Sequence, residues 1–161
     1  MEKVSIFVDA QNVYYTTKQA FACGFDYNRF WARATAGREV VQAIAYSSDR
    51  GDSKQRQFQN ILRAIGFEVK LKPYIQRADG SSKCDWDVGI TIDALKAAAE
   101  SDVVVLVSGD GDFDRLLSTV NVDHGVRTEV YGVEALTAGS LIDAAARFIP
   151  IEGDLLLTKK S

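Results

Sequence analysis

The stretch VVVLVSGDGD occupies residues 103–112 and contains the features that decide the fold. Its first half, residues 103–107, is an uninterrupted apolar run, and such a run indicates a strand that is buried on both faces. Two glycines alternate with the polar residues Ser108, Asp110 and Asp112 directly after it. Glycine suits a point where the backbone turns tightly or where a phosphate approaches it. We therefore expect a buried strand that delivers acids to the edge of a sheet.

The same pattern extends along the chain on both sides of this stretch. Short β-branched runs predict strands at residues 4–8, 40–46, 67–72, 103–107, 127–131 and 148–149. Longer amphipathic segments predict helices at residues 12–23, 27–36, 53–65, 87–100, 113–122 and 140–147. Alternating strands and helices with fully apolar strands are typical of an α/β fold, with a mainly parallel sheet covered on both faces.

The composition fits one folded domain. The 161 residues are 47% hydrophobic, which excludes a disordered or fibrous chain and predicts a single domain over residues 1–161. Its core should lie within about residues 4–149, followed by a short C-terminal tail. The net charge of -3 means that any attraction to nucleic acid must come from a local patch. No apolar run approaches the roughly 20 residues that span a bilayer, so we expect no membrane association.

The scarce residue types limit the chemistry. Cys23, Cys84 and His124 are too few and too far apart for a Cys/His zinc site, so any metal should have oxygen ligands. His124 lies in a segment typical of a helix end with a glycine cap, and we do not expect it to be catalytic. Two free thiols without a disulfide framework are typical of a reducing compartment, which predicts a cytoplasmic location.

Acids follow two of the predicted strands. Asp9 ends the first strand, with Asn12 three residues later, and Asp110 follows the strand at residues 103–107. Because the carboxyl ends of parallel strands open onto the same edge of a sheet, these side chains should lie close together. Asp87 adds a further acid at the start of a predicted helix.

Helical geometry separates the two acids of that helix. Asp93 lies six residues after Asp87, which places the two side chains about 120° apart around the helix axis. They cannot both face one ion by simple stacking. We therefore expect Asp87, rather than Asp93, to act as a ligand.

An acidic cluster of this kind needs a counter-charge. Two carboxylates about 4 Å apart repel each other by about 4 kcal/mol at an effective dielectric constant of 20. Oxygen ligands without His or Cys favour Mg²⁺ or Mn²⁺, and we expect Asp9, Asp87 and Asp110 to bind the ion. This arrangement suits attack on a phosphodiester by metal-activated water. Each strand-end Asp could instead simply cap the following helix, and Asp112 in particular could cap the helix at residues 113–122.

Three blocks of sequence carry a resemblance to a known family. They are Ile6-Phe7-Val8-Asp9-Ala10-Gln11-Asn12, Lys83-Cys84-Asp85-Trp86-Asp87 with Asp93, and Val107-Ser108-Gly109-Asp110-Gly111-Asp112-Phe113. Over about residues 4–149 the chain resembles the NYN domain of LabA-like proteins, a branch of the PIN-like nuclease superfamily. The middle block departs from the family, which more often has Lys-Gly-Val before the acid.

The resemblance implies a fold and a site. It implies a Rossmann-like three-layer α/β/α sandwich with an acidic pocket that binds Mg²⁺ or Mn²⁺ for RNA hydrolysis. The catalytic residues would be Asp9, Asp87, Asp110 and Asp112, with Asn12 and Ser108 lining the pocket. Asp93 also matches a family acid. Some members of the family are known only as regulators.

A basic segment lies between the first and second acidic blocks. Residues 50–83 contain eight Lys or Arg against three acids, with aromatic residues interleaved. Such a stretch suits single-stranded RNA, and we expect Lys83 to contact a phosphate. An ordinary solvated face explains the pattern equally well.

These observations favour a metal-dependent ribonuclease. The first alternative is a non-catalytic RNA-binding or regulatory module that retains the acidic pocket. A second alternative is an aspartyl phosphatase, but that chemistry usually needs a second acid two residues after the strand-end Asp, where this chain has Gln11. Whether the chain forms a homodimer is left open.

Overall fold

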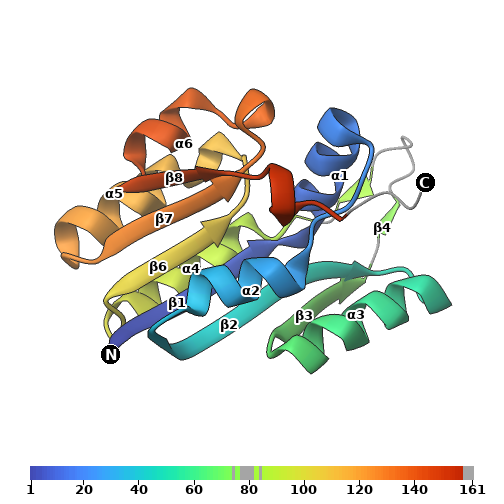
Figure 1. Ribbon diagram of the computed structural model, residues 1–161, viewed down its shortest axis with the longest axis horizontal. Helices are drawn as coiled ribbons and strands as arrows, with labels where there is room; N and C mark the ends of the chain where they lie inside the picture. The colour runs from blue at the N-terminus through green and yellow to red at the C-terminus, as the bar shows by residue number, and fades with distance from the viewer. Residues whose placement is uncertain (74, 77–81, 84, 158–161) are drawn as a thin grey trace.

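A parallel β-sheet forms the centre of the structure (Figure 1). The computed structural model describes residues 1–73, 75–76, 82–83 and 85–157. Within these residues, six strands are ordered β3-β2-β1-β6-β7-β8, and every neighbouring pair is parallel. The strands are β1 (Glu2–Asp9), β2 (Arg38–Asp49), β3 (Glu68–Pro73), β6 (Val103–Val107), β7 (Arg127–Gly132) and β8 (Arg147–Pro150). The predicted α/β fold with a mainly parallel sheet is confirmed.

Helices cover both faces of this sheet. They are α1 (Ala10–Phe21), α2 (Tyr27–Thr35), α3 (Ser53–Ile65), α4 (Asp87–Ala98), α5 (Asp114–Asp123) and α6 (Gly139–Ala144). Helices α2 and α3 pack on one face, whereas α4, α5 and α6 pack on the other (Figure 1). Together they form the three layers expected of a Rossmann-like sandwich. No helix in the described ranges is long and apolar enough to cross a membrane.

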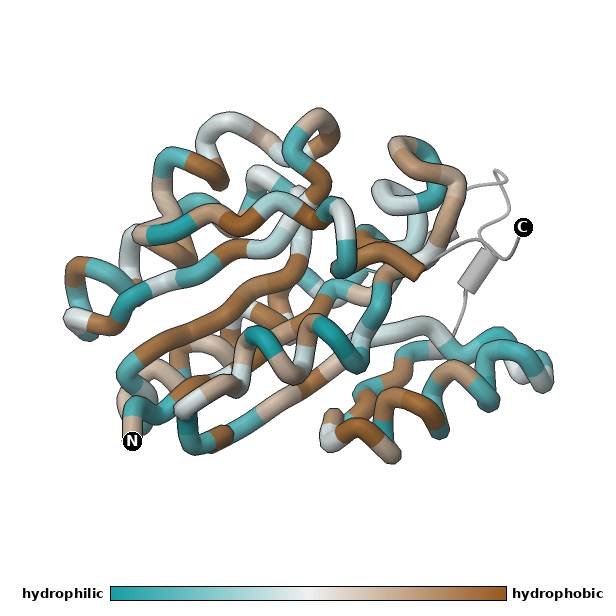
Figure 2. The backbone as a smooth tube through the Cα atoms, viewed as in Figure 1, coloured by the Kyte–Doolittle hydropathy of each residue, from teal (hydrophilic) through white to brown (hydrophobic). Residues whose placement is uncertain are grey.

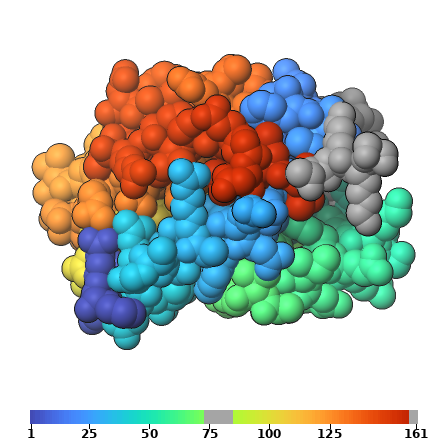
Figure 3. All heavy atoms as spheres, viewed as in Figure 1, coloured from blue at the N-terminus to red at the C-terminus, as the bar shows by residue number. Residues whose placement is uncertain are grey.

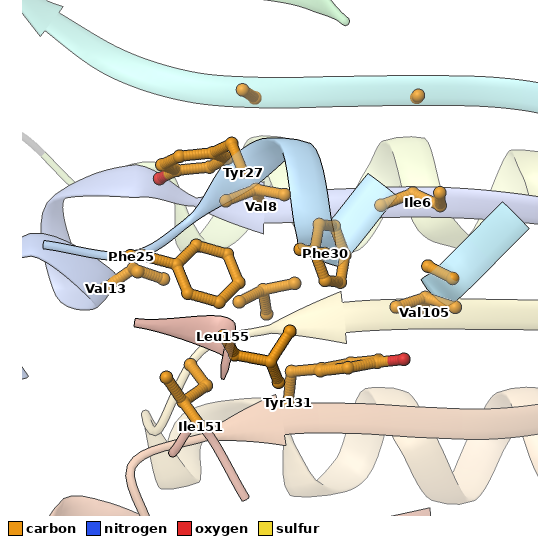
Figure 4. Close-up of a cluster of buried hydrophobic side chains, with 14 of the residues drawn as sticks. Ile6, Val8, Val13, Phe25, Tyr27, Phe30, Val105, Tyr131, Ile151 and Leu155 are labelled. Atoms are coloured by element: carbon orange, nitrogen blue, oxygen red, sulfur yellow. The ribbon is translucent and has the colours of Figure 1, made fainter. Parts of the chain in front are cut away.

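Alternating side chains of the central strands supply two separate hydrophobic cores. In β1, Val4, Ile6 and Val8 pack on the side of α2, whereas Phe7 packs on the side of α4. Figure 2 shows β6 as a continuous hydrophobic stretch through the middle of the sheet, because both of its faces are covered. Figure 4 shows one core, where Phe30 lies edge-on against Tyr131 with ring centroids 4.8 Å apart.

Several boundaries differ from the sequence-based expectations. Strand β2 extends beyond the predicted residues 40–46 because its later residues pair with β3. A short 3-10 turn, Gly111–Phe113, precedes α5, and the predicted helix at residues 140–147 ends at Ala144 because Arg147 starts β8. The antiparallel strands β4 (Ile75–Gln76) and β5 (Ser82–Lys83) were not predicted. The sequence Ala-Asp-Gly-Ser-Ser at residues 78–82 predicts a loop, and most of it lies outside the described residues.

The strand order reverses between β1 and β6. From β1 the chain adds β2 and β3 on one side, and from β6 it adds β7 and β8 on the other. In open parallel sheets, ligands bind beyond the carboxyl ends of the strands at such a reversal point. Asp9 ends β1 and Ser108 follows β6, so the fold brings the predicted acids to this point.

Charged side chains connect the strands at the amino-terminal end of the sheet, opposite the predicted site. Arg38 donates two hydrogen bonds to the nearly buried carboxylate of Glu129, at 2.9 and 2.8 Å, and a third to Glu2 at 2.9 Å. Burial raises the pKa of Glu129, but the hydrogen bonds and charge of Arg38 outweigh burial and hold that pKa below its usual range. This network joins the first residues of β1 and β2 to β7.

Candidate functional site

Asp9 connects β1 to the loop that follows β6. Its carboxylate accepts a hydrogen bond from the backbone N–H of Asn12 at 3.5 Å, which caps α1. The buried Ser108 hydroxyl donates to the other oxygen of Asp9 at 3.1 Å. The Asn12 side-chain oxygen in turn accepts from the Gly109 N–H at 2.9 Å. Asp9, Asn12 and Ser108 therefore join the start of α1 to the glycine-rich loop, in addition to the capping role of Asp9.

The glycine-rich loop packs closely against the segment before α6. A Cβ on Gly109 would lie 2.9 Å from the Leu136 carbonyl oxygen, and one on Gly111 would lie 2.8 Å from the Ala138 Cβ. The two glycines are therefore required by this close approach rather than by an unusual φ angle. The Asp110 carboxylate accepts from the backbone N–H of Asp112 at 2.9 Å and so caps the 3-10 turn.

Trp86 positions the third acidic segment at the start of α4. Its indole N–H donates to the carbonyl oxygen of Ser47 in β2 at 2.9 Å, and its ring lies 5.2 Å from that of Tyr46. The Lys72 ammonium lies 4.5 Å from the Trp86 ring centroid and donates to the Asp85 carbonyl oxygen at 2.7 Å. These contacts fix the start of α4 beside the carboxyl end of the sheet.

Three carboxylates from two segments converge at this edge. Among the described residues, Asp87, Asp110 and Asp112 each offer one oxygen, and these oxygens all lie within 4.8 Å of one another. That spacing and the all-oxygen donor set fit a hard divalent cation such as Mg²⁺ or Mn²⁺. Asp9 does not belong to this group of three. It lies beside the group, linked to Asp110 because the Asp110 N–H donates to the Ser108 hydroxyl at 3.2 Å.

Asp9 and Asp87 hold protons more tightly than ordinary carboxylic acids do. Burial raises the pKa of Asp9 to about 6, and the charges of Asp110 and Asp85 also raise it, although hydrogen bonds from Ser108 and Asn12 oppose the rise. Burial likewise raises the pKa of Asp87 to about 8, together with hydrogen bonding and charge repulsion from Asp85 and Asp110. The chain has therefore concentrated acids that repel one another.

Asp93 lies on a different face of α4 and has a different role. Its carboxylate accepts from the Lys70 ammonium at 2.8 Å and from the Tyr46 hydroxyl at 2.7 Å. Burial raises the pKa of Asp93, but these two hydrogen bonds and the nearby lysine charge outweigh it and leave the pKa below its usual range. The structure thus separates Asp93 from Asp87, as the helical geometry predicts.

The basic segment is not a uniform RNA-facing surface. Lys70 is paired with Asp93 in the middle of α4, and Lys72 lies on Trp86 just before α4, so both lysines help to hold this helix in place. The side chain of Lys83 lies outside the described part of the structure, and its phosphate contact stays a prediction. Counting charges along the sequence could not reveal these partners, which lie on another element.

Two site residues were absent from the predicted set. Asp85 accepts a hydrogen bond from the Asp87 N–H at 2.7 Å and raises the pKa of Asp87, and Trp86 anchors the segment. Their position directly before Asp87 was the available signal. The sequence alone offered no reason to separate an anchoring tryptophan from one that stacks on RNA.

Comparisons with known proteins agree with this architecture. The family model for the NYN domain matches residues 3–152. The chain is 28% identical over 158 residues to the low amplitude and bright protein LabA of Synechococcus elongatus, with 92% of this chain and 83% of LabA covered. The crystal structure of a protein of unknown function from Vibrio parahaemolyticus matches with a TM-score of 0.92 and 55% identity, covering 97% of this chain and 96% of that one. The chain therefore belongs to the NYN domain family, within the PIN-like nuclease superfamily.

Proposed function

We propose that this protein is a metal-dependent ribonuclease that hydrolyses phosphodiester bonds in single-stranded RNA. The observation that carries the proposal is the convergence of Asp87, Asp110 and Asp112 within 4.8 Å at the strand-order reversal. Three carboxylates at this distance are costly without a cation, because each pair repels by several kcal/mol in a protein environment. Membership of the NYN family favours RNA as the substrate.

Asp87, Asp110 and Asp112 would hold the ion, through one oxygen each. Mg²⁺ or Mn²⁺ bound there would supply Lewis-acid activation of water and neutralise charge that develops on the phosphate. Asp112 is exposed, so the group faces solvent and is accessible to a large substrate.

Asp9 and its partners would keep the ligands in place. The Ser108 hydroxyl donates to Asp9 and accepts from the Asp110 N–H, so it fixes the relative position of the two acids. Asn12 holds the Gly109 N–H from the other side. The Asp9 carboxylate adds negative charge next to Asp110, which strengthens the attraction of the site for a cation.

The test is cleavage of a labelled single-stranded RNA in Mn²⁺ or Mg²⁺, with and without EDTA. We expect cleavage that EDTA abolishes and that Asp110→Asn reduces by at least 100-fold. Asp123→Asn is the matched control, because Asp123 is an exposed acid at the end of α5. No cleavage in any divalent ion would refute the enzyme. RNA binding that persists without cleavage, and that survives Asp110→Asn, would instead identify a regulatory RNA-binding module.

A further inference from the structure

A cavity of about 500 Å³ lies at the end of the sheet where the carboxylate site is found. Ala10 and Gln11, which line it, are the two residues after Asp9. Ser47, which also lines the cavity, follows Tyr46, the residue of β2 that pairs with Asp9. The cavity therefore lies near the carboxyl ends of β1 and β2, at the same end of the sheet as the proposed cleavage site.

The walls of this cavity come from α1, the residues that lead into α2, β2, α3 and the C-terminal segment. Figure 3 shows the face of the molecule on which α1, α3 and the last described residues gather. The apolar lining residues are Val13, Phe25, Tyr27, Phe58 and Leu157. Tyr27 packs edge-on against Phe25 and Phe58, with ring centroids 4.9 and 5.5 Å away, so this wall is a connected aromatic cluster. Its volume falls in the range of about 300–1,000 Å³ that is typical of small-molecule sites.

Polar and basic groups surround the apolar wall. Gln11, Ser47, Ser48 and Gln55 offer hydrogen-bond donors and acceptors, and Lys54 contributes a positive charge in the first turn of α3. The carboxylate of Asp52, which also lines the cavity, caps α3 by accepting from the Gln55 N–H at 2.7 Å. An apolar wall with polar groups and a cation at its border matches a nucleotide, which combines a flat base with a charged phosphate.

Two tyrosines at this cavity are exposed without serving the core. The side chains of Tyr14 and Tyr15 are 54% and 51% exposed, and their rings lie edge to face 5.4 Å apart. Both residues line the cavity. Exposed aromatic rings beside a positive charge are typical of surfaces that stack the bases of single-stranded nucleic acid.

We propose that this cavity binds one nucleobase of the RNA strand whose phosphodiester lies at the carboxylate cluster. The inference rests on the proposed function for its substrate class. Tyr14 and Tyr15 provide the stacking surface, and Lys54 attracts the adjoining phosphate. The substrate must be single-stranded, because paired bases in an RNA duplex are not free to enter a cavity.

The experiment measures binding without cleavage, in EDTA and in the Asp110→Asn background. The probe is a fluorescently labelled ten-nucleotide single-stranded RNA, compared with copies that lack one base at each position in turn. We expect Tyr14→Ala/Tyr15→Ala to weaken binding by about 5- to 100-fold, the loss typical of base-stacking contacts. Phe21→Ala is the matched control, because Phe21 is a partly exposed aromatic residue of α1 outside this cavity, and it should leave binding unchanged.

The probes that lack a base locate the contact. At one position of the RNA, removal of the base should weaken binding to the protein that retains Tyr14 and Tyr15. The same removal should not change the affinity of the Tyr14→Ala/Tyr15→Ala variant. Lys54→Glu should weaken binding and reduce its salt dependence, whereas Arg63→Glu, at the other end of α3, should not. Equal losses at every position, or unchanged affinity in the tyrosine variant, would refute the base-binding cavity.

Failure of this inference and failure of the ribonuclease proposal give different results. If the wild type cleaves RNA and its affinity for RNA does not depend on Tyr14 and Tyr15, the base-binding cavity is refuted and the ribonuclease proposal stands. If RNA binding depends on Tyr14 and Tyr15 but no divalent ion supports cleavage, the base-binding cavity stands and the ribonuclease proposal is refuted. A double-stranded probe that competes as well as the single strand would also refute the base-binding cavity.

Discussion

Replacing Asp9 with Asn should stabilise the metal-free protein while it removes RNA cleavage. The Asp9 carboxylate is largely buried, and burial raises its pKa from 3.8 to about 6. An acid with a raised pKa stabilises the folded state below its unfolded pKa, and that contribution is lost as the pH rises through the folded pKa. Above pH 6 the charged Asp9 therefore opposes folding.

The magnitude follows from the size of this shift. A change of about two pKa units corresponds to about 3 kcal/mol at pH 8, because each unit is worth about 1.36 kcal/mol. The asparagine side-chain oxygen can still accept from the Asn12 N–H, and its NH2 group can donate to the Ser108 hydroxyl, which accepts as well as donates. For a domain of this size, 1 kcal/mol shifts the melting temperature by about 2–4 °C, so the melting temperature of Asp9→Asn should rise by about 6–12 °C at pH 8.

The assay is thermal unfolding in EDTA at pH 4 and pH 8, followed by circular dichroism. At pH 4 the native Asp9 is already protonated, so the difference between wild type and Asp9→Asn should nearly vanish. Asp123→Asn serves as the control for removal of a charge, and it should change the melting temperature little at either pH. A variant that is less stable than wild type at pH 8 would show that the Asp9 charge is favourable and would refute the reasoning.

Three further outcomes are expected. Mn²⁺ or Mg²⁺ at 100 times its Kd should stabilise the wild type by about 2.7 kcal/mol, measured as a rise in melting temperature. An equal rise in Asp110→Asn would contradict a metal site that includes Asp110. Arg38→Met should lower the free energy of unfolding by about 3 kcal/mol at pH 7, because it leaves the Glu129 charge buried and unpaired. Since the pKa of Glu129 is lowered, that difference should shrink in denaturant titrations below pH 4.5, and a constant difference would argue against the ion pair. Trp86→Phe removes the hydrogen bond to β2 and should lower the free energy of unfolding by about 1 kcal/mol. Trp86→Ala should also reduce the stabilisation by Mn²⁺. Equal stabilisation by Mn²⁺ in the wild type and both variants would exclude an anchoring role for Trp86.

Much of the fold could be predicted because its signal is local. The apolar run of β6 indicates that both faces of the strand are buried, and Asp110 follows it at the carboxyl end of the sheet. The position of Asp87 relative to Asp93 followed from helix geometry alone. Element ends were harder, since β2 continues to Asp49 only because β3 is there to pair with it.

The details of the site depend on contacts between distant segments, which a single sequence does not encode in any local pattern. Asp112 could have been only a helix cap, and its place beside Asp87 depends on how Trp86 fixes α4 against β2. Lys72 counts as part of a basic stretch in the sequence, yet in the fold it contacts Trp86. The cavity is lined by segments that lie far apart in the sequence, and no single one of them predicts it.

Two acids of α4 show how the chain separates structural charge from functional charge. Asp93 is neutralised by Lys70 and has a lowered pKa, whereas Asp87 is surrounded by Asp85 and Asp110 and has a raised one. At the amino-terminal end of the sheet, Glu129 is likewise paired with Arg38. The chain therefore compensates buried acids where they serve the fold, and the repulsion among the acids at the strand-order reversal is the property that a divalent cation would relieve.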